Sequence, residues 1–249
     1  MTSVDEELFM LLFQSVNQIC VYSINDYQRL RHLDVLGYKP QPANDITSCV
    51  RHKCLYLSDY ENRCIHRYEL ASSATSKWSV PGKPRGLSVT PSGNLLVACY
   101  GVYEPHKLVE LSVVSGQRVR EIALQRDIRR SCHSVQLTTG QFVICQGEQD
   151  SPHRVCLVGD DGKVTRSYGL KRGSGVGELK EPCHLAVDKD SQFIFVADHD
   201  NARVVLLSPT IEFVRYIEGP SYPRRLYFHQ ATRRLFVCQS GRSVIVIRL

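Results

Sequence analysis

Six short apolar runs recur along the chain at nearly equal spacing, and this repetition constrains the fold more than any other feature of the sequence. The runs end at residues 14, 59, 99, 145, 198 and 238, so successive ends lie 45, 40, 46, 53 and 40 residues apart. A period of about 40–50 residues is typical of a unit with four short strands. One such unit cannot bury both of its faces, whereas a stack of units can.

Each run has apolar neighbours that complete a four-strand unit. A second run lies upstream, often behind a proline, as at 84–89, 182–187 and 223–228, and further runs follow downstream, as at 204–207 and 213–217. β-branched and aromatic residues dominate the runs, and no segment has a sustained helical period. The sequence therefore predicts an all-β fold, a six-bladed β-propeller of four-stranded antiparallel blades, in a single domain over residues 1–249.

The two ends of the chain leave one detail of this fold open. The first block shows three strands, near residues 8–13, 19–23 and 31–35, and the last block ends at Leu249 after its third strand. Residues near Val4 complete either the first or the last blade, and the sequence does not decide between them.

Blade five carries a more specific pattern. After a glycine-rich stretch at 173–177 come Pro-x-x-Leu-Ala-Val-Asp at 182–188 and Val-Ala-Asp-x-x-Asn-x-Arg at 196–203, and blade two has a shorter version at 56–63. This pattern resembles the NHL repeat found in tripartite-motif proteins. It covers the whole chain in outline and one blade in detail. In such a turn Asp198 can accept backbone N–H bonds, and Asn201 is a residue that tolerates a positive φ.

The composition excludes several other classes of protein. The formal net charge is +6 and 43% of the residues are hydrophobic, as in globular domains. No apolar run approaches the ~20 residues of a membrane-spanning helix, so no membrane association is expected. The ten cysteines include no Cys-x-x-Cys pair, and several lie inside apolar runs. We expect free thiols in a reducing compartment and a cytoplasmic location.

Three features raise the question of a nucleotide or a metal. The stretch at 173–177 lacks the Gly-Lys-Ser/Thr ending of a phosphate-binding loop, so no nucleotide is expected. Cys132–His133 and Cys183–His184 have the same position in blades four and five, but neighbouring residues on a strand point to opposite faces. A third group matches no closed zinc motif: Cys49, His52, Cys54, Cys64 and His66. We expect no metal and no cofactor.

Catalysis is not expected either. The chain contains no Gly-x-Ser-x-Gly and no His-Glu-x-x-His motif. The NHL-like peptide-amidating lyases use channel histidines on zinc, and His133 and His184 make a zinc-dependent lyase the second alternative function. Cys183, however, directly follows Pro182, where that family has its histidine.

A binding surface is the remaining expectation. In propellers the starts of the innermost strands and the hairpins between the second and third strands share one face, and loops on a rigid scaffold often bind ligands. Basic and aromatic residues at these positions form the predicted ligand- or partner-binding set: Arg85, Tyr100, Tyr103, His106, Arg129, Arg130, His133, His153, His184, Arg224 and Arg225.

The partner itself is predicted by chemistry alone. Basic groups beside aromatic rings suit acidic peptides and single-stranded RNA. A protein or peptide partner is favoured because Glu104, Glu148 and Asp150 interrupt the basic residues, and RNA is the first alternative. The resemblance to NHL domains further implies a role as the substrate-recognition part of a ubiquitin-ligase-like system, although no RING or B-box array is present in this sequence.

Overall fold

A computed structural model describes residues 1–12, 18–39, 44–101, 106–147, 152–169, 171–240 and 243–249. The chain divides into two compact units. Unit 1 comprises residues 1–103 and 109–121, and unit 2 comprises residues 104–108 and 122–249. The expectation of a single domain stays a prediction.

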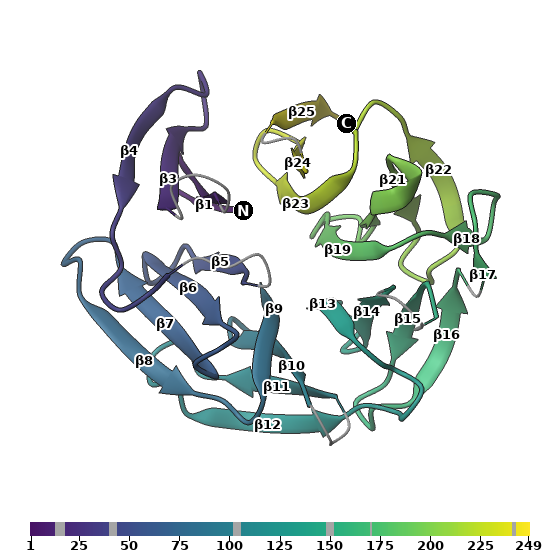
Figure 1. Ribbon diagram of the computed structural model, residues 1–249, viewed down its shortest axis with the longest axis horizontal. Coiled ribbons are helices and arrows are strands. Elements are labelled where there is room, and N and C mark those ends of the chain that lie inside the picture. Colours follow the sequence, from purple (N-terminus) through teal and green to yellow (C-terminus); the bar gives the residue numbers. More distant parts are fainter. Residues whose placement is uncertain (13–17, 40–43, 102–105, 148–151, 170, 241–242) are drawn as a thin grey trace. The chain divides into compact units, whose positions relative to one another are not determined.

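Unit 1 contains the first three antiparallel sheets, which we call blades 1 to 3 (Figure 1). Blade 1 has β1 (Thr2–Val4), β2 (Glu7–Leu12), β3 (Gln18–Ser23) and β4 (Arg29–Leu33). Blade 2 has β5 (Ile46–Cys49), β6 (Cys54–Asp59), β7 (Cys64–Glu69) and β8 (Thr75–Ser79). Blade 3, which falls mainly in unit 1, has β9 (Lys83–Val89), β10 (Leu95–Tyr100), β11 (Lys107–Leu111) and β12 (Arg118–Ala123).

Unit 2 contains blades 4 to 6 (Figure 1). Blade 4 has β13 (Ser131–Gln136), β14 (Phe142–Gln146), β15 (Arg154–Val158) and β16 (Val164–Tyr168). Blade 5 has β19 (Pro182–Val187), β20 (Ile194–Asp198), β21 (Arg203–Leu207) and β22 (Phe213–Ile217). Blade 6 has β23 (Pro223–His229), β24 (Arg234–Gln239) and β25 (Val244–Arg248). A short parallel pair, β17 (Lys171–Arg172) and β18 (Glu178–Leu179), and one 3₁₀ turn, η1 (His199–Asn201), complete the described elements.

The predicted all-β fold is confirmed, with two refinements. Strand β1 pairs with β2, with Thr2 opposite Phe9 and Val4 opposite Glu7, so the residues near Val4 complete the first blade. Blade 6 shows three strands among the described residues, β23, β24 and β25, in line with the three apolar runs of the last block of the sequence.

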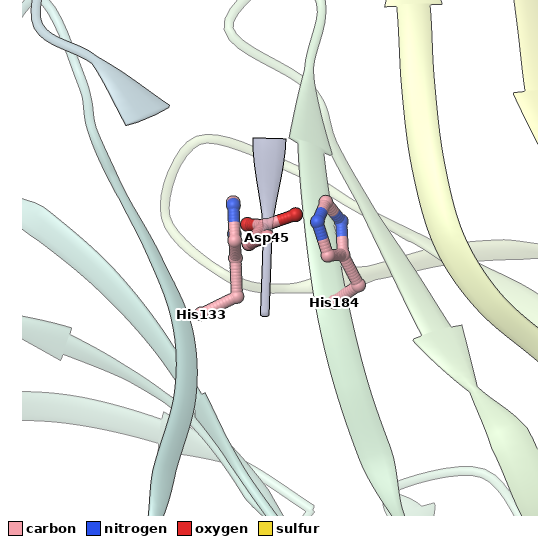
Figure 2. Close-up of side chains that lie close together, drawn as sticks. All are labelled: Asp45, His133 and His184. Carbon is pink, nitrogen blue, oxygen red and sulfur yellow. The ribbon is translucent and has the colours of Figure 1, made fainter. Parts of the chain in front are cut away.

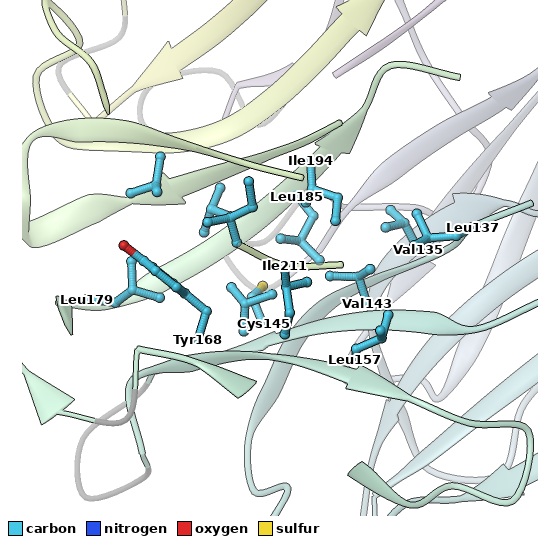
Figure 3. Packing of buried hydrophobic residues seen from close by; sticks show 14 residues of the cluster. Val135, Leu137, Val143, Cys145, Leu157, Tyr168, Leu179, Leu185, Ile194 and Ile211 are labelled. Atoms are coloured by element: carbon cyan, nitrogen blue, oxygen red, sulfur yellow. The ribbon is translucent and has the colours of Figure 1, made fainter. Parts of the chain in front are cut away.

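The apolar runs form the cores between neighbouring sheets within each unit. Between blades 4 and 5, for example, Val143 and Val155 from one sheet join Leu185, Val196 and other side chains from the next (Figure 3). The central strands β14, β15, β20 and β21 are buried along their whole length, as expected for strands covered on both faces. The outer strand β16 is more open, with Thr165 and Arg166 exposed and only Tyr168 buried.

The hairpin between β20 and β21 explains the NHL-like signature of blade 5. The Asp198 carboxylate accepts the Lys180 N–H at 2.6 Å, and its second oxygen accepts the Asn201 amide and the Arg203 Nε–H, both at 2.8 Å. Asn201, which tolerates a positive φ, does not have one here. The left-handed residue is Ala202, with φ of 50°, since Asn201 closes the short 3₁₀ turn and uses its side chain to hold Asp198.

Candidate interaction site

Three loops in unit 2 run into the innermost strands β13, β19 and β23, and we call them the lead-in loops (residues 126–130, 180–181 and 220–222). Each ends with a non-glycine residue in the left-handed region: Arg130 with φ of 52°, Glu181 with φ of 55° and Tyr222 with φ of 49°. Such backbone is costly for residues with a side chain, so the surrounding contacts must hold it. The three loops are therefore built in the same way.

Two buried histidines supply those contacts. The Arg130 N–H donates to His106 Nε2 at 3.1 Å, and the Glu181 N–H donates to His153 Nδ1 at 2.8 Å. Each histidine precedes the third strand of one blade and reaches the loop that leads into the next inner strand. Both side chains are buried. His106 and His153 thus stabilise the loops, whereas a direct role in ligand binding stays a prediction.

A β-bulge follows each lead-in loop and aims the side chains of the predicted set. The register shifts between Ser131 and His133 in blade 4, between Pro182 and His184 in blade 5, and between Pro223 and Arg225 in blade 6. One extra residue in a bulge is left out of the ladder, and its side chain is turned. The extra residues are Cys132, Cys183 and Arg224, and the residues that follow them are His133, His184 and Arg225.

The two inner histidines meet ring to ring. His133 and His184 come from the neighbouring strands β13 and β19, and their ring centroids lie 3.8 Å apart with 27° between the planes (Figure 2). His184 Nδ1 accepts the Leu226 N–H of β23 at 3.3 Å. In its neutral form His184 therefore carries its proton on Nε2. The structure brings this predicted pair together, buried and stacked.

The cysteines next to these histidines do not join them. Cys132 packs on the core of blades 4 and 5, and Cys183 packs on the core of blades 5 and 6, 3.4 Å from the Pro223 carbonyl oxygen. Burial raises the pKa of the Cys183 thiol to about 11, although Arg225 and Arg224 act in the opposite direction. The thiol is therefore protonated at neutral pH. All ten cysteines lie as free thiols.

The arginines of the lead-in loops and bulges are the most accessible members of the predicted set. Arg129 and Arg224 are exposed, and Arg130 and Arg225 are half-buried. Arg224 Nε donates to the Ser240 hydroxyl at 3.0 Å, and Tyr222, two residues earlier in the chain, is 51% exposed. Within the described parts of the chain, no carboxylate forms an ion pair with Arg129 or Arg224. These two guanidinium groups can therefore receive an anionic ligand.

The acidic residues near these loops already have basic partners. Asp127 pairs with Arg154 at 2.8 Å, and Asp200 contacts His199 Nδ1 at 2.8 Å and Arg172 at 3.8 Å. The lead-in loops thus keep an excess of positive charge. Three acidic residues that favoured a protein partner in the sequence, Glu104, Glu148 and Asp150, lie outside the described residues.

The members of the predicted set in unit 1 form a smaller group. Arg85 is half-buried on β9, and its carbonyl oxygen accepts the Ser58 hydroxyl at 2.9 Å. The Tyr100 ring lies 6.5 Å from the Tyr60 ring, and Lys83 Nζ lies 4.4 Å from the centre of the Tyr60 ring. Tyr103 lies outside the described residues.

The glycine-rich loop of blade 5 uses its own polar groups internally. The Gly175 N–H donates to the Glu178 carboxylate at 2.9 Å, and the Gly177 N–H donates to the Tyr168 hydroxyl at 3.1 Å. Arg203 donates to the Ser174 and Glu178 carbonyl oxygens at 2.7 and 3.1 Å. The Glu178 carboxylate, which belongs to the loop itself, therefore accepts the Gly175 N–H that a bound anion would otherwise accept.

The supporting role of His106 and His153 was missed by the sequence reasoning, although a signal was present. Both histidines stand directly before a basic residue and an apolar run, in His-Lys-Leu-Val and His-Arg-Val-Cys. That shared position indicates a repeated structural task. Which backbone amide each ring reaches depends on contacts between residues that are far apart in sequence, here 24 and 28 positions.

Comparison with known proteins identifies the fold and not the family. No family model matches the sequence, and no curated protein matches it. Solved structures match along nearly the whole chain. A chain of hydrazine synthase from Kuenenia stuttgartiensis has a TM-score of 0.70 at 12% identity, covering 100% of this chain and 94% of that one.

Two further solved structures show the same likeness. A chain of a nidogen/laminin complex has a TM-score of 0.71 at 17% identity, covering 98% of this chain and 89% of that one. The β-propeller domain of Cps50 (Swd1) from Myceliophteria thermophila has a TM-score of 0.64 at 12% identity, covering 98% and 80%. The chain therefore has the fold of a six-bladed β-propeller, which is compatible with a protein-interaction scaffold. Within the described residues, no helix is long and apolar enough to cross a membrane.

Proposed function

We propose that this chain is a non-catalytic recognition module that binds an acidic segment of a protein partner through the lead-in loops of unit 2. The observation that carries the proposal is the state of Arg129 and Arg224. Both are exposed, and neither forms an ion pair with a described carboxylate. The Arg130 N–H bond to His106 holds the loop that carries Arg129, and the Arg224 side chain bonds to the Ser240 hydroxyl, so little conformational entropy is lost when a ligand binds.

The chemistry of the loops favours carboxylates presented by a peptide. An arginine binds a carboxylate through two parallel N–H bonds. Tyr222, an exposed residue of the same lead-in segment, adds apolar area, and arginine and tyrosine are enriched at protein interfaces.

The cellular setting follows from resemblance. NHL domains of tripartite-motif proteins suggest that this module serves as the substrate-recognition part of a ubiquitin-ligase-like system in the cytoplasm. The propeller fold supports such a scaffold, because propellers present loops on a rigid frame, but a fold alone does not fix function.

The test is a binding titration with defined probes. Fluorescence anisotropy should show binding of a labelled peptide rich in Glu and Asp, and Arg129→Glu combined with Arg224→Glu should weaken it by about 100-fold, since each interface arginine is worth roughly 1–2 kcal/mol. Arg166→Glu is the matched control, because Arg166 is an exposed arginine of unit 2 on the outer strand β16. Equal binding by all three proteins would reject the proposal.

The alternatives give different results in the same assay. An RNA-binding propeller would favour single-stranded RNA over the peptide, with affinity that falls steeply as salt rises. The group of Tyr60, Tyr100 and Lys83 in unit 1 is the observation that favours this alternative, since bases stack on aromatic rings. A zinc-dependent lyase would need His133 and His184 for metal binding, and replacing either with Asn would then release the metal.

A further inference from the structure

Two hairpins of this chain are built on the same plan but differ in the residue that stands opposite their aspartate. Asp59 ends β6 and Asp198 ends β20, and an asparagine follows three residues later in each turn, Asn62 or Asn201. The residue after each asparagine, Arg63 or Ala202, has a φ near 50°.

The next residue in each hairpin stands opposite the aspartate in the antiparallel register. In blade 5 that residue is Arg203, paired with Asp198, and in blade 2 it is Cys64, paired with Asp59.

The blade 5 hairpin neutralises its buried carboxylate with a fixed cation. The Asp198 side chain is fully buried, and Arg203 Nε donates to it at 2.8 Å. The guanidinium also lies 3.9 Å from the centre of the Tyr216 ring. A buried charge is stable only when it is paired and hydrogen-bonded, and this arginine supplies both.

The blade 2 hairpin buries the same carboxylate without an arginine. The Asp59 side chain is 6% exposed, and one oxygen accepts the Asn62 amide at 2.8 Å and contacts His66 Nε2 at 3.1 Å. Among the described residues, no lysine or arginine forms an ion pair with Asp59. Lys77 lies across from His66 on β8 and acts on Cys64 only through its charge at a distance.

Cys64 and His66 stand where the missing cation would be. They are two positions apart on β7, so their side chains point to the same face, and Asp59 is directly opposite Cys64. One ligand atom from each of Asp59, Cys64 and His66 lies within 4.8 Å of the other two. All three residues are buried.

His66 adds a second and independent observation. Its side chain is fully buried, and its Nδ1 has no hydrogen-bond partner among the described residues. Buried polar atoms are nearly always satisfied, and an orphan indicates a missing water or ion.

We propose that Asp59, Cys64 and His66 bind one divalent transition-metal ion, best Zn²⁺, within blade 2. Thiolate, imidazole and carboxylate are the donors that zinc prefers, and a water completes four-fold coordination. The thiolate disfavours Ca²⁺ and Mg²⁺, which prefer oxygen donors. Binding releases the thiol proton of Cys64 to solvent. The ion supplies in blade 2 the positive charge that Arg203 supplies in blade 5.

The experiment uses the full chain refolded from denaturant, because the site is buried. After refolding with excess Zn²⁺ and removal of free metal, elemental analysis should find about one zinc per chain. Refolding with Co²⁺ should give the near-ultraviolet absorption of a thiolate–cobalt bond. Cys64→Ser should abolish that band and weaken zinc binding by at least about 100-fold, since even an outer-shell partner is worth 10–100-fold.

Three control variants make the result specific. Cys54→Ser removes a buried cysteine of the same sheet that lies outside the cluster and should leave binding unchanged. His184→Asn should also leave it unchanged, which separates this site from a metal at the inner histidines. Cys64→Arg copies blade 5 and should fold with a melting temperature that zinc no longer raises.

The contradicting results are equally definite. Folded wild-type protein that retains no zinc and shows no cobalt–thiolate band overturns the proposal. Binding that survives Cys64→Ser overturns it as well. Neither outcome depends on the lead-in loops, so the peptide titration stands or fails separately.

Discussion

Several buried polar side chains in this protein form hydrogen bonds with backbone N–H groups. Asp45 accepts the Leu87 N–H at 2.9 Å within unit 1, and His184 accepts the Leu226 N–H within unit 2. Both side chains stand just before the apolar part of an inner strand and reach the next inner strand of their own unit. A buried N–H without a partner costs about 1–3 kcal/mol, so these positions fix how neighbouring sheets meet.

The Asp198–Arg203 pair should be the most costly ion pair to break. Replacing Arg203 with Met leaves a buried carboxylate without its cation, and we expect a loss of about 3–5 kcal/mol in the free energy of unfolding. The matched control is Arg166→Met, because the Arg166–Glu212 pair is exposed at 55% and 69% and such pairs contribute about 1 kcal/mol or less. Urea unfolding measures both, and equal losses would refute the role of burial.

Asp188 should make stability depend on acid pH. Burial alone would raise the pKa of Asp188, but hydrogen bonds from the Ser191 hydroxyl, the Asp190 N–H and Arg233 outweigh it and lower that pKa. A carboxyl whose pKa is lower in the folded state stabilises the fold above its unfolded pKa and loses this contribution as pH falls.

The variant Asp188→Asn should therefore be less stable than wild type at pH 7 by about 1–3 kcal/mol. The difference should stay constant down to pH 5 and shrink only below about pH 4. Chemical denaturation at each pH gives the measurement. A difference that already closes above pH 5 would show that another group is responsible.

At the scale of single elements, the tight turns of unit 1 offer a matched pair of glycines. Gly93, between β9 and β10, has a φ of 86° with open space around it, whereas Gly116, between β11 and β12, has a φ of 70° and faces the Trp78 ring. Replacing Gly93 with alanine should lower the free energy of unfolding by about 1–2 kcal/mol, because alanine is strained in a left-handed backbone.

Alanine at Gly116 should cost about 1–3 kcal/mol more, because its methyl group overlaps the Trp78 ring. The midpoint of urea unfolding compares the two variants. Similar midpoints would mean that Trp78 moves aside at little cost.

The strands themselves were predictable, and their exceptions have physical reasons. Runs such as 194–197 and 204–207 are apolar throughout because both faces are covered, and the sequence shows this directly. β1, with three residues, and β17 and β18, with two each, are too short to carry a pattern. Ala202 replaced Asn201 as the left-handed residue because the Asn201 side chain is needed at Asp198.

The candidate site was predictable only in part. The shared position of His133 and His184 follows from the repeat, so their meeting could be anticipated. The bulges at Cys132, Cys183 and Arg224 could not be predicted from the sequence, since a bulge depends on the pairing between strands. In the proposed metal site of blade 2, the sequence analysis considered Cys64 and His66 but not Asp59, because Asp59 joins them through the register of a hairpin and not through a spacing motif.

Across the blades of the molecule, the backbone of the lead-in loops repeats, whereas the side chains on these loops differ from blade to blade. Blades 4 to 6 share a left-handed residue and a bulge at the start of the inner strand. The bulged residue is a cysteine in two of these blades and an exposed arginine in the third. The proposed partner therefore contacts side chains that differ from blade to blade on a backbone that stays the same. Rigid scaffolds often bind different ligands in this way, through their loops.

Hydrogen–deuterium exchange of the full chain, with and without the acidic peptide that binds best in the titration, tests the central proposal most directly. We predict slower amide exchange at residues 126–133, 180–185 and 220–226 when the peptide is bound. The hairpins at residues 138–141 and 160–163 should exchange as in the free protein. Protection confined to those hairpins or to unit 1, or no protection anywhere at saturating peptide, would contradict the proposal that the lead-in loops of unit 2 hold the partner.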